Sequence, residues 1–130
     1  MVGVSMVPKI IVAIKALVKN SMIAIGSGGK IRIQIWRKDT NHIGFSVVDN
    51  GPGVDGEMAG EIFEPYFSGR EAGRGIGFGL SKAWRILQLH HGSLELDSEY
   101  FEGARFVATL PIRQYVGEKK VSRIDNLRAA

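Results

Sequence analysis

The sequence has no cysteine among its 130 residues, only 4 prolines, and no long apolar run. Without cysteine the chain can form neither a disulfide framework nor a thiolate metal site, and it has no cysteine nucleophile. Its longest apolar run, residues 10–14, is far shorter than the roughly 20 residues that cross a bilayer. The first seven residues lack the charged flank and apolar centre of a secretory signal. We therefore expect a cytoplasmic domain, which leaves open a membrane anchor in a longer parent protein.

The charge balance is mildly basic, with 17 Lys and Arg against 13 Asp and Glu, and part of the excess lies at the C-terminal end. No basic stripe interleaved with stacking aromatics accompanies it, so nucleic acid is not an expected partner. The length suits a single domain. We expect an N-terminal extension over residues 1–7, one domain over 8–112, and a solvated basic tail over 113–130.

Apolar periodicity and glycine positions predict the order of helices and strands. The expected helices cover 9–25, a short stretch from Asp55 or Gly56 through Ile62, and 78–91; the expected strands cover 30–38, 42–50, 93–98 and 104–112. In the first strand Ile31, Ile33 and Ile35 alternate with polar residues, which predicts a half-buried strand. The order is typical of an α+β fold, a two-layer sandwich whose mixed, mostly antiparallel sheet is covered on one face by helices.

Glycine is abundant, with 17 residues concentrated in two clusters rather than scattered. One is Gly51 and Gly53, and the other, residues 73–79, directly precedes the last predicted helix. Backbone amides at a helix N-terminus form a cradle for anions such as phosphate. Neither cluster matches a P-loop, and a polar loop stands where the dinucleotide fingerprint needs a strand. An ordinary flexible loop and a phosphate-binding loop both remain open on this pattern.

Two polar residues stand where ligand binding would explain them. Asp49 ends a predicted strand beside a Gly-Pro-Gly turn, so its carboxylate can accept from an exocyclic amine while a flat base approaches the turn. Asn20 lies in mid-helix against its propensity, with small neighbours at Ala16 and Ala24. Such an amide can ligate Mg²⁺ alongside phosphate oxygens, although a buried or exposed structural amide is the alternative.

Four blocks then follow one another along the chain: residues 16–21 (ALVKNS), 49–53 (DNGPG), 62–67 (IFEPYF) and 75–81 (GIGFGLS). In this order they resemble the asparagine, first glycine, phenylalanine and second glycine boxes of the catalytic, ATP-binding domain of sensor histidine kinases, which has the Bergerat fold. The resemblance covers residues 8–112, and the phenylalanine box favours histidine kinases over the other ATPases of this fold.

The resemblance implies ATP and Mg²⁺ as ligands, and it assigns no catalytic residue. The implied cofactor-binding residues are Asn20, Asp49, Gly51, Gly53, Arg70, Gly75, Gly77 and Gly79. Among them the aspartate would bind the adenine amine, the asparagine the metal ion, and the first two glycines the edge of the base. The last three glycines would hold the phosphates, and the arginine the γ-phosphate. Phe63 and Phe67 would anchor the intervening loop, or pack in the core.

Two departures from the family pattern concern catalysis. Val12 and Ala16 stand where the family commonly has polar residues, in one helical row with Asn20. General acid–base assistance is worth about a hundred- to ten-thousand-fold, so nucleotide binding could survive while phosphoryl transfer falls. The three histidines, His42, His90 and His91, are expected to be structural or surface groups. The phosphoacceptor histidine is therefore expected on a separate dimerisation domain, with a response regulator as the further partner.

The leading hypothesis is an ATP-binding kinase domain that presents the γ-phosphate of ATP to that histidine, as a histidine kinase-type phosphotransferase. The alternative is a catalytically impaired, nucleotide-binding regulatory module that acts through protein partners. An ATPase or an anti-sigma-type serine kinase on the same fold is a third option, and the acid lability of phosphohistidine would separate it.

Overall fold

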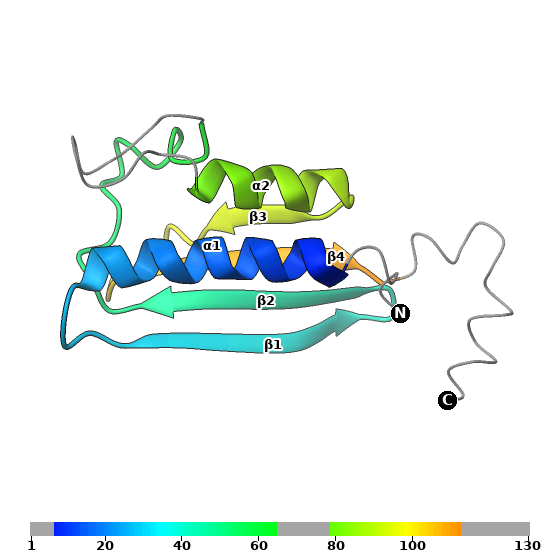
Figure 1. Ribbon diagram of the computed structural model, residues 1–130, viewed down its shortest axis with the longest axis horizontal. Coiled ribbons are helices and arrows are strands. Elements are labelled where there is room, and N and C mark those ends of the chain that lie inside the picture. The colour runs from blue at the N-terminus through cyan, green and yellow to red at the C-terminus, as the bar shows by residue number, and fades with distance from the viewer. Residues whose placement is uncertain (1–6, 65–78, 113–130) are drawn as a thin grey trace, which may run out of the picture.

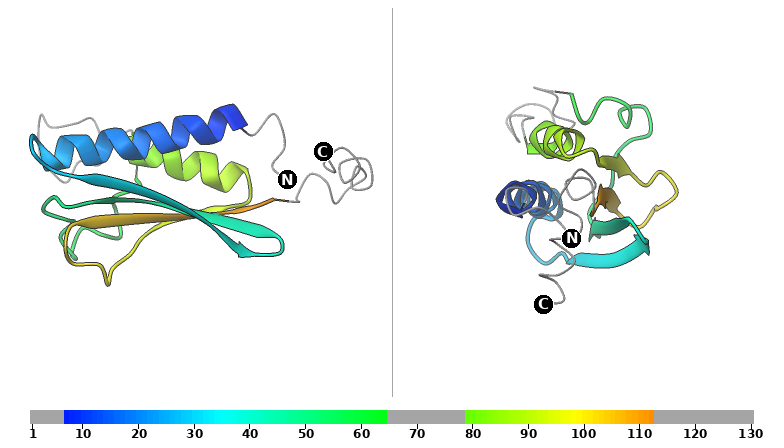
Figure 2. Two further views of the ribbon diagram at one scale, coloured as in Figure 1. Left: turned by 90° about the horizontal axis from the view of Figure 1, so that it is seen from below. Right: turned by 90° about the vertical axis from the view of Figure 1, so that its right-hand side faces the viewer.

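Two layers make up the part of the chain that the computed structural model describes, residues 7–64 and 79–112. In chain order its elements are α1 (Val7–Ile25), β1 (Ile31–Asp39), β2 (His42–Asp49), α2 (Gly79–Leu89), β3 (Ser93–Leu96) and β4 (Ala104–Pro111). The strands form one sheet in the order β1-β2-β4-β3, in which every neighbouring pair is antiparallel. Both helices cover the same face (Figures 1 and 2). The predicted α+β sandwich is confirmed.

Helix α1 begins and ends where local chemistry allows it. Pro8 stands in the first turn, where its missing N–H costs no hydrogen bond and its fixed φ suits the helix. Gly26 follows the last helical residue with φ +64° and donates its N–H to Met22, 3.3 Å away. This is the left-handed cap that glycine adopts without strain. Between these ends Ala13, Leu17 and Ser21, spaced by four residues, are fully buried.

The first two strands, β1 and β2, form a hairpin. Asp39 closes its tip by accepting the N–H of Asn41 at 2.8 Å, in the manner of an Asx turn. The register places Ile33 opposite Val47 and Ile35 opposite Phe45. Residues directly opposite in a sheet share a face, so both isoleucines lie on the helix side.

The isoleucines of β1 are nevertheless more exposed than the alternation predicts. Ile33 is 47% and Ile35 70% exposed, so the expected half-buried strand is wrong for these two residues. Strand β1 is at the edge of the sheet, whereas α1 lies over β2 and α2 over β3 (Figure 2). Alternation selects the face of a strand, but the order of strands decides whether a helix covers that face.

The core lies between the central strands and the helices. Phe106 of β4 is fully buried and meets Phe63 edge-on, with ring centroids 6.3 Å apart. Small residues on the helices, Ala13 and Ala83, let α1 and α2 approach each other above the sheet. Other fully or nearly fully buried apolar residues of this core include Leu17, Phe45, Val47, Ile62, Leu87, Leu94, Ala108 and Leu110. Burying one such Phe or Leu side chain contributes about 1.5–3 kcal/mol.

The short helix expected from Asp55 or Gly56 through Ile62 is not formed. Successive turns occupy this stretch, with hydrogen bonds of 2.9 Å from the N–H of Met58 to Asp55 and from that of Glu61 to Met58. Gly56 and Gly60 each cost a helix about 1 kcal/mol relative to alanine. Ile62 alone in this stretch is buried, so no apolar face offsets that cost. Within the described residues, no helix has the length and apolar character that spanning a membrane requires.

Candidate functional site

Asp49 is the last residue of β2 and points to the helix side of the sheet, as Val47 does. Its side chain is buried, with 2% exposed. Oδ1 accepts the N–H groups of Gly51 at 2.9 Å and of Ala104 at 3.3 Å. Oδ2 is also buried but has no hydrogen-bond partner among residues 7–64 and 79–112. Leaving such an oxygen unpartnered is costly, so this atom is a ready acceptor for a ligand donor.

Tight backbone contacts hold the turn that follows Asp49. Gly53 has φ +80°, and a Cβ there would lie 2.9 Å from the carbonyl oxygen of Gly103. Gly103 has φ +151°, and a Cβ there would overlap the carbonyl oxygen of Asp49. Both positions therefore require glycine on conformational and steric grounds. The start of β4 is thereby pressed against the end of β2, which places the N–H of Ala104 within reach of the aspartate.

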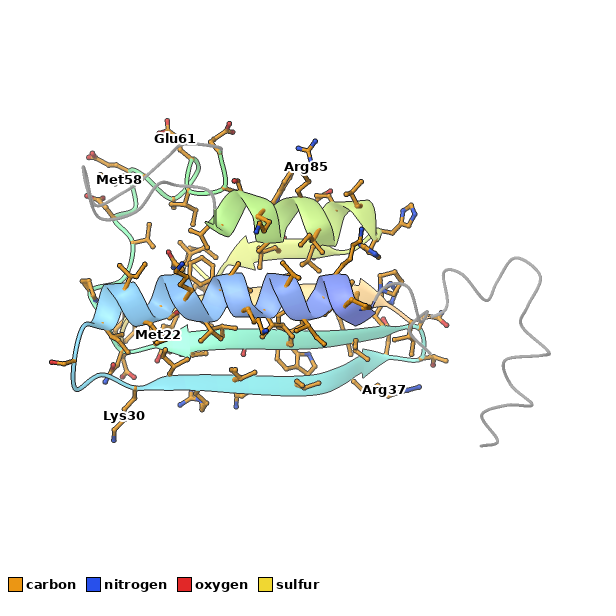
Figure 3. All side chains as sticks on the ribbon, in the orientation of Figure 1. Met22, Lys30, Arg37, Met58, Glu61 and Arg85 are labelled. Carbon is orange, nitrogen blue, oxygen red and sulfur yellow. The ribbon has the colours of Figure 1, made fainter. Side chains whose placement is uncertain are left out.

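Gly51 lies between the carboxylate and the end of α1. A Cβ at this position would be 3.3 Å from Oδ1 of Asp49 and 3.2 Å from Cγ2 of Ile25. The predicted first glycine pair thus lies directly beside the predicted aspartate. In Figure 1 the end of β2, the end of α1, and the starts of β4 and α2 all lie at the same end of the molecule. The residues labelled in Figure 3 at this end, Met58 and Glu61 among them, point outward.

Asn20 is half-buried on α1, in a helical row with Ala16 and Val12. The backbone of this row comes close to the start of α2, where the carbonyl oxygen of Ala16 lies 3.9 Å from the Cβ position of Gly79. Val12 is 41% exposed. One amide is therefore the whole polar content of this row, as the sequence indicates.

The predicted phosphate-binding loop is described only at its last residue. Gly79 is exposed and begins α2, where the free N–H groups of a helix start favour an anion. Arg70, Gly75 and Gly77 lie outside the described residues, as does Phe67. Phe63 packs edge-on against Phe106, which agrees with its core interpretation.

The histidines make local contacts. Nδ1 of His90 donates to the carbonyl oxygen of Ile86, 2.9 Å away and one turn earlier in α2. Nδ1 of His42 lies 2.9 Å from Asp39, and this hydrogen bond is the main cause that holds the pKa of Asp39 below its ordinary value. His91 has φ +62° just after α2, a left-handed cap position. These contacts fit the structural roles expected of the three residues.

Sequence reasoning missed two groups of this site. The N–H of Ala104 and the backbone of Gly103 reach Asp49 from the start of the neighbouring strand β4, which is distant in sequence. Glu102-Gly103 could be predicted as a turn, but nothing local in the sequence connects that turn with β2.

The fold and the aspartate–glycine site together define a nucleotide-binding ATPase class. Residues 7–114 match the family described as histidine kinase-, DNA gyrase B- and HSP90-like ATPase. The chain belongs to this family. Within it, the chain is the catalytic, ATP-binding domain of the two-component sensor histidine kinase class, a transferase domain.

Two curated relatives support this placement. The signal transduction histidine-protein kinase AtoS of Escherichia coli is 39% identical over 93 residues, covering 72% of this chain and 15% of that protein. Sporulation kinase E of Bacillus subtilis is 32% identical over 104 residues, covering 80% of this chain and 14% of that protein. The chain therefore spans only about one-seventh of the length of either relative.

Solved structures of histidine kinases have the same fold. The nucleotide-free catalytic domain of the histidine kinase ThkA superposes with a TM-score of 0.70 at 28% identity, covering 81% of this chain and 68% of that one. The mycobacterial sensor histidine kinase MprB gives a TM-score of 0.69 at 23% identity, with coverages of 77% and 70%. The second likeness bears on the fold alone.

Proposed function

We propose that this domain holds ATP with Mg²⁺ and presents the γ-phosphate to a histidine on a separate dimerisation domain of a larger parent protein. A response regulator would then take the phosphoryl group from that histidine. The site of this chemistry would be the cytoplasm, where ATP is available. Residues 8–112 would form the nucleotide-binding domain.

The observation that carries the proposal is the state of the Asp49 carboxylate. One oxygen is satisfied by two backbone N–H groups, and the other is buried without a partner in the described chain. A carboxylate oxygen only accepts, so it selects a donor such as the exocyclic amine of adenine. The neighbouring Gly51 and Gly53 carry no side chains, which would let the edge of a flat base approach the backbone.

The phosphate side of the site would be formed by α1 and by the start of α2. Asn20 would supply an amide oxygen to Mg²⁺, a ligand type that this ion accepts alongside phosphate oxygens and water. Among the described residues no group of three or more His, Cys, Asp or Glu side chains could hold a metal ion alone. The donor set thus fits a metal ion that arrives with the triphosphate. Gly75, Gly77 and Gly79 would hold the phosphates, and Arg70 the γ-phosphate.

The contribution of this chain to catalysis would be positioning and charge neutralisation, because phosphoryl transfer needs little covalent chemistry from the protein. Bound Mg²⁺ would supply neutralisation of the phosphate charge. Asp49 would fix the base, the start of α2 would place N–H donors toward the phosphates, and Arg70 would orient the terminal phosphate for an acceptor histidine.

Calorimetric titration with a non-hydrolysable ATP analogue tests the proposal. We expect binding by the wild type and a loss of about a hundredfold or more in Asp49→Ala, because a buried hydrogen bond to a charged group is removed. Asp39→Ala, at the other end of the hairpin, is the matched control and should bind as the wild type does. Asp49→Asn keeps the volume and should also bind weakly. No binding at millimolar ligand, or unchanged binding in both Asp49 variants, would overturn the proposal.

A second candidate function is a catalytically impaired nucleotide-binding module that acts through protein partners. The observation in its favour is the row on α1, where Val12 and Ala16 offer no polar group beside Asn20. Both candidates bind ATP. They differ in the rate of phosphoryl transfer from the bound nucleotide, which should be near background for the impaired module.

A further inference from the structure

Ser21 is a buried polar residue for which nothing above gives a use. Its side chain is 0% exposed, and its hydroxyl has no hydrogen-bond partner in the described part of the chain. A serine inside a helix usually donates to the carbonyl oxygen one turn earlier, and Ser21 makes no such bond. A buried hydroxyl without a partner costs free energy, as the free oxygen of Asp49 does.

The packing of α1 on β2 places this hydroxyl at the Asp49 end of the strand. Both elements run in the same direction (Figure 1). Four residues of a helix rise about 6 Å, and two residues of a strand advance about 6.6–6.8 Å. Successive residues of the buried row of α1, Leu17 and Ser21, are therefore spaced almost as far apart as Val47 and Asp49 of β2. Leu17 and Val47 belong to the same hydrophobic core.

Ile25 shows which end of β2 lies beside the end of α1. It lies one turn beyond Ser21 on α1, and its Cγ2 is 3.2 Å from the Cβ position of Gly51. Gly51 is two residues beyond Asp49, and the same Cβ position is 3.3 Å from Oδ1 of Asp49. With Ile25 beside Gly51, one turn back along α1 brings Ser21 toward the end of β2. Two buried polar groups without complete hydrogen bonding, the Ser21 hydroxyl and Oδ2 of Asp49, thus belong to the same end of the molecule.

We propose that Ser21 is a specificity-determining residue which, together with Asp49, recognises the amine-bearing edge of adenine. This inference rests on the proposed function. Oδ2 of Asp49 accepts from the exocyclic amine, and the Ser21 hydroxyl donates to a ring nitrogen that flanks the amine, directly or through one water. A purine with a carbonyl at that position turns an oxygen toward the carboxylate and is rejected. The carboxylate acceptor and the hydroxyl donor thus match the amine donor and the ring-nitrogen acceptor of adenine.

The test compares ADP with 1-deaza-ADP, 7-deaza-ADP and GDP by calorimetric titration of the wild type and of Ser21→Ala. We expect Ser21→Ala to weaken ADP binding about five- to tenfold, the range of one neutral hydrogen bond. One deaza analogue should lose a similar factor with the wild type and lose nothing further with Ser21→Ala, because both changes remove the same hydrogen bond. The preference for ADP over GDP should narrow in the variant.

Ser46→Ala is the matched control. Ser46 is also fully buried with an unpartnered hydroxyl, but it alternates with Phe45 and Val47 and so lies on the other face of the sheet. It should bind all four nucleotides as the wild type does. Ser21→Cys, nearly isosteric with a weaker donor, should show the same trend if the alanine variant unfolds.

The outcomes separate this inference from the function on which it rests. Failure of the wild type to bind ADP at millimolar concentration would overturn the proposed function. If the wild type binds ADP and both deaza analogues equally, the role of Ser21 is overturned while the nucleotide site stands. Additive losses in Ser21→Ala and the deaza analogues would overturn it as well.

Discussion

The proposed nucleotide site has two halves, the base half around Asp49 and the phosphate half around Asn20, and they differ in how tightly the fold constrains them. At the end of β2, Asp49 is 2% exposed, its Oδ1 accepts two backbone N–H groups, and Gly103 is pressed against its carbonyl. On α1, Asn20 is the one polar side chain of its row, and Val12 is 41% exposed.

This difference indicates which part of the proposed site tolerates substitution. The base half is built from buried groups and close backbone contacts, in which most substitutions would cost folding free energy as well as binding. The row on α1 is partly solvent-exposed, so polar residues there can be replaced at little cost to the fold. Loss of transfer with retention of nucleotide binding is therefore the easier change for this structure.

Restoring the polar row should produce the largest change. In Val12→Glu with Ala16→Asn, phosphoryl transfer from ATP to a histidine-bearing acceptor domain from a relative such as AtoS should rise about a hundredfold or more. Affinity for a non-hydrolysable ATP analogue should change little. Ile11→Glu with Lys15→Asn adds the same groups on the neighbouring, exposed row of α1 and should have no effect. An unchanged rate in the restored variant would contradict the idea that this row limits transfer.

In the base half, Gly103→Ala should lower both the free energy of unfolding and the affinity for nucleotide. The new Cβ would overlap the carbonyl oxygen of Asp49 at a φ of +151°. We expect a loss of at least about 2 kcal/mol in the free energy of unfolding, measured by chemical denaturation, and weaker nucleotide binding. Gly60→Ala is the control, because a Cβ there meets nothing within 4 Å. Equal stability of the two variants would show that the base half is less constrained than the contacts indicate.

Asn20→Ala should distinguish the two halves, because it should weaken a ligand that carries phosphates and leave one without phosphates unchanged. We expect Mg²⁺·ATP to bind about tenfold more weakly, equivalent to the loss of about 1.4 kcal/mol, while adenosine binds as before because it has no phosphates. Asn41→Ala, at the hairpin tip, is the control. A similar loss for adenosine would assign Asn20 to the base half instead.

Lowering the pH should have the smallest effect, and it acts through Asp97, which belongs to neither half of the site. Asp97 accepts the N–H of Glu99 at 3.0 Å and the guanidinium of Arg105 at 2.8 Å, and these contacts lower the pKa of its carboxyl below 3.8. Its stabilisation is complete above that value and is lost as the pH falls through the folded-state pKa. Denaturation midpoints between about pH 5 and pH 2 should therefore fall slightly less in Asp97→Asn than in the wild type. Glu95→Gln, two residues earlier on β3, is the control, and an equal fall in both variants would remove Asp97 as a cause.

Much of the fold was predictable because its signals are local. The period of apolar residues and the glycine after Ile25 mark α1 closely, and the aspartate–glycine turn marks the end of β2. The exposure of Ile33 and Ile35 was not predictable in this way, because it depends on the position of β1 in the strand order. The turns that replace the expected helix over 55–62 were not predictable either, because only the structure shows that Ile62 alone is buried there and that a helix would have no apolar face to pack.

The candidate site also contains residues that local motifs predict and partners that they do not. Asp49, Gly51, Gly53 and Asn20 stand in sequence blocks that a motif can identify. One of the two backbone partners of the aspartate, the N–H of Ala104, comes instead from β4, far along the chain. Such pairings depend on the register between elements distant in sequence, which one sequence does not display.

The β3–β4 connection offers a position for a fluorescent reporter. Phe101 is 88% exposed, yet it stands two residues before Gly103, whose backbone touches Asp49. Since the chain has no cysteine, Phe101→Cys would give one thiol for dye attachment. A dye there would sit in water close to the base half of the site, so nucleotide loading could be followed optically in real time.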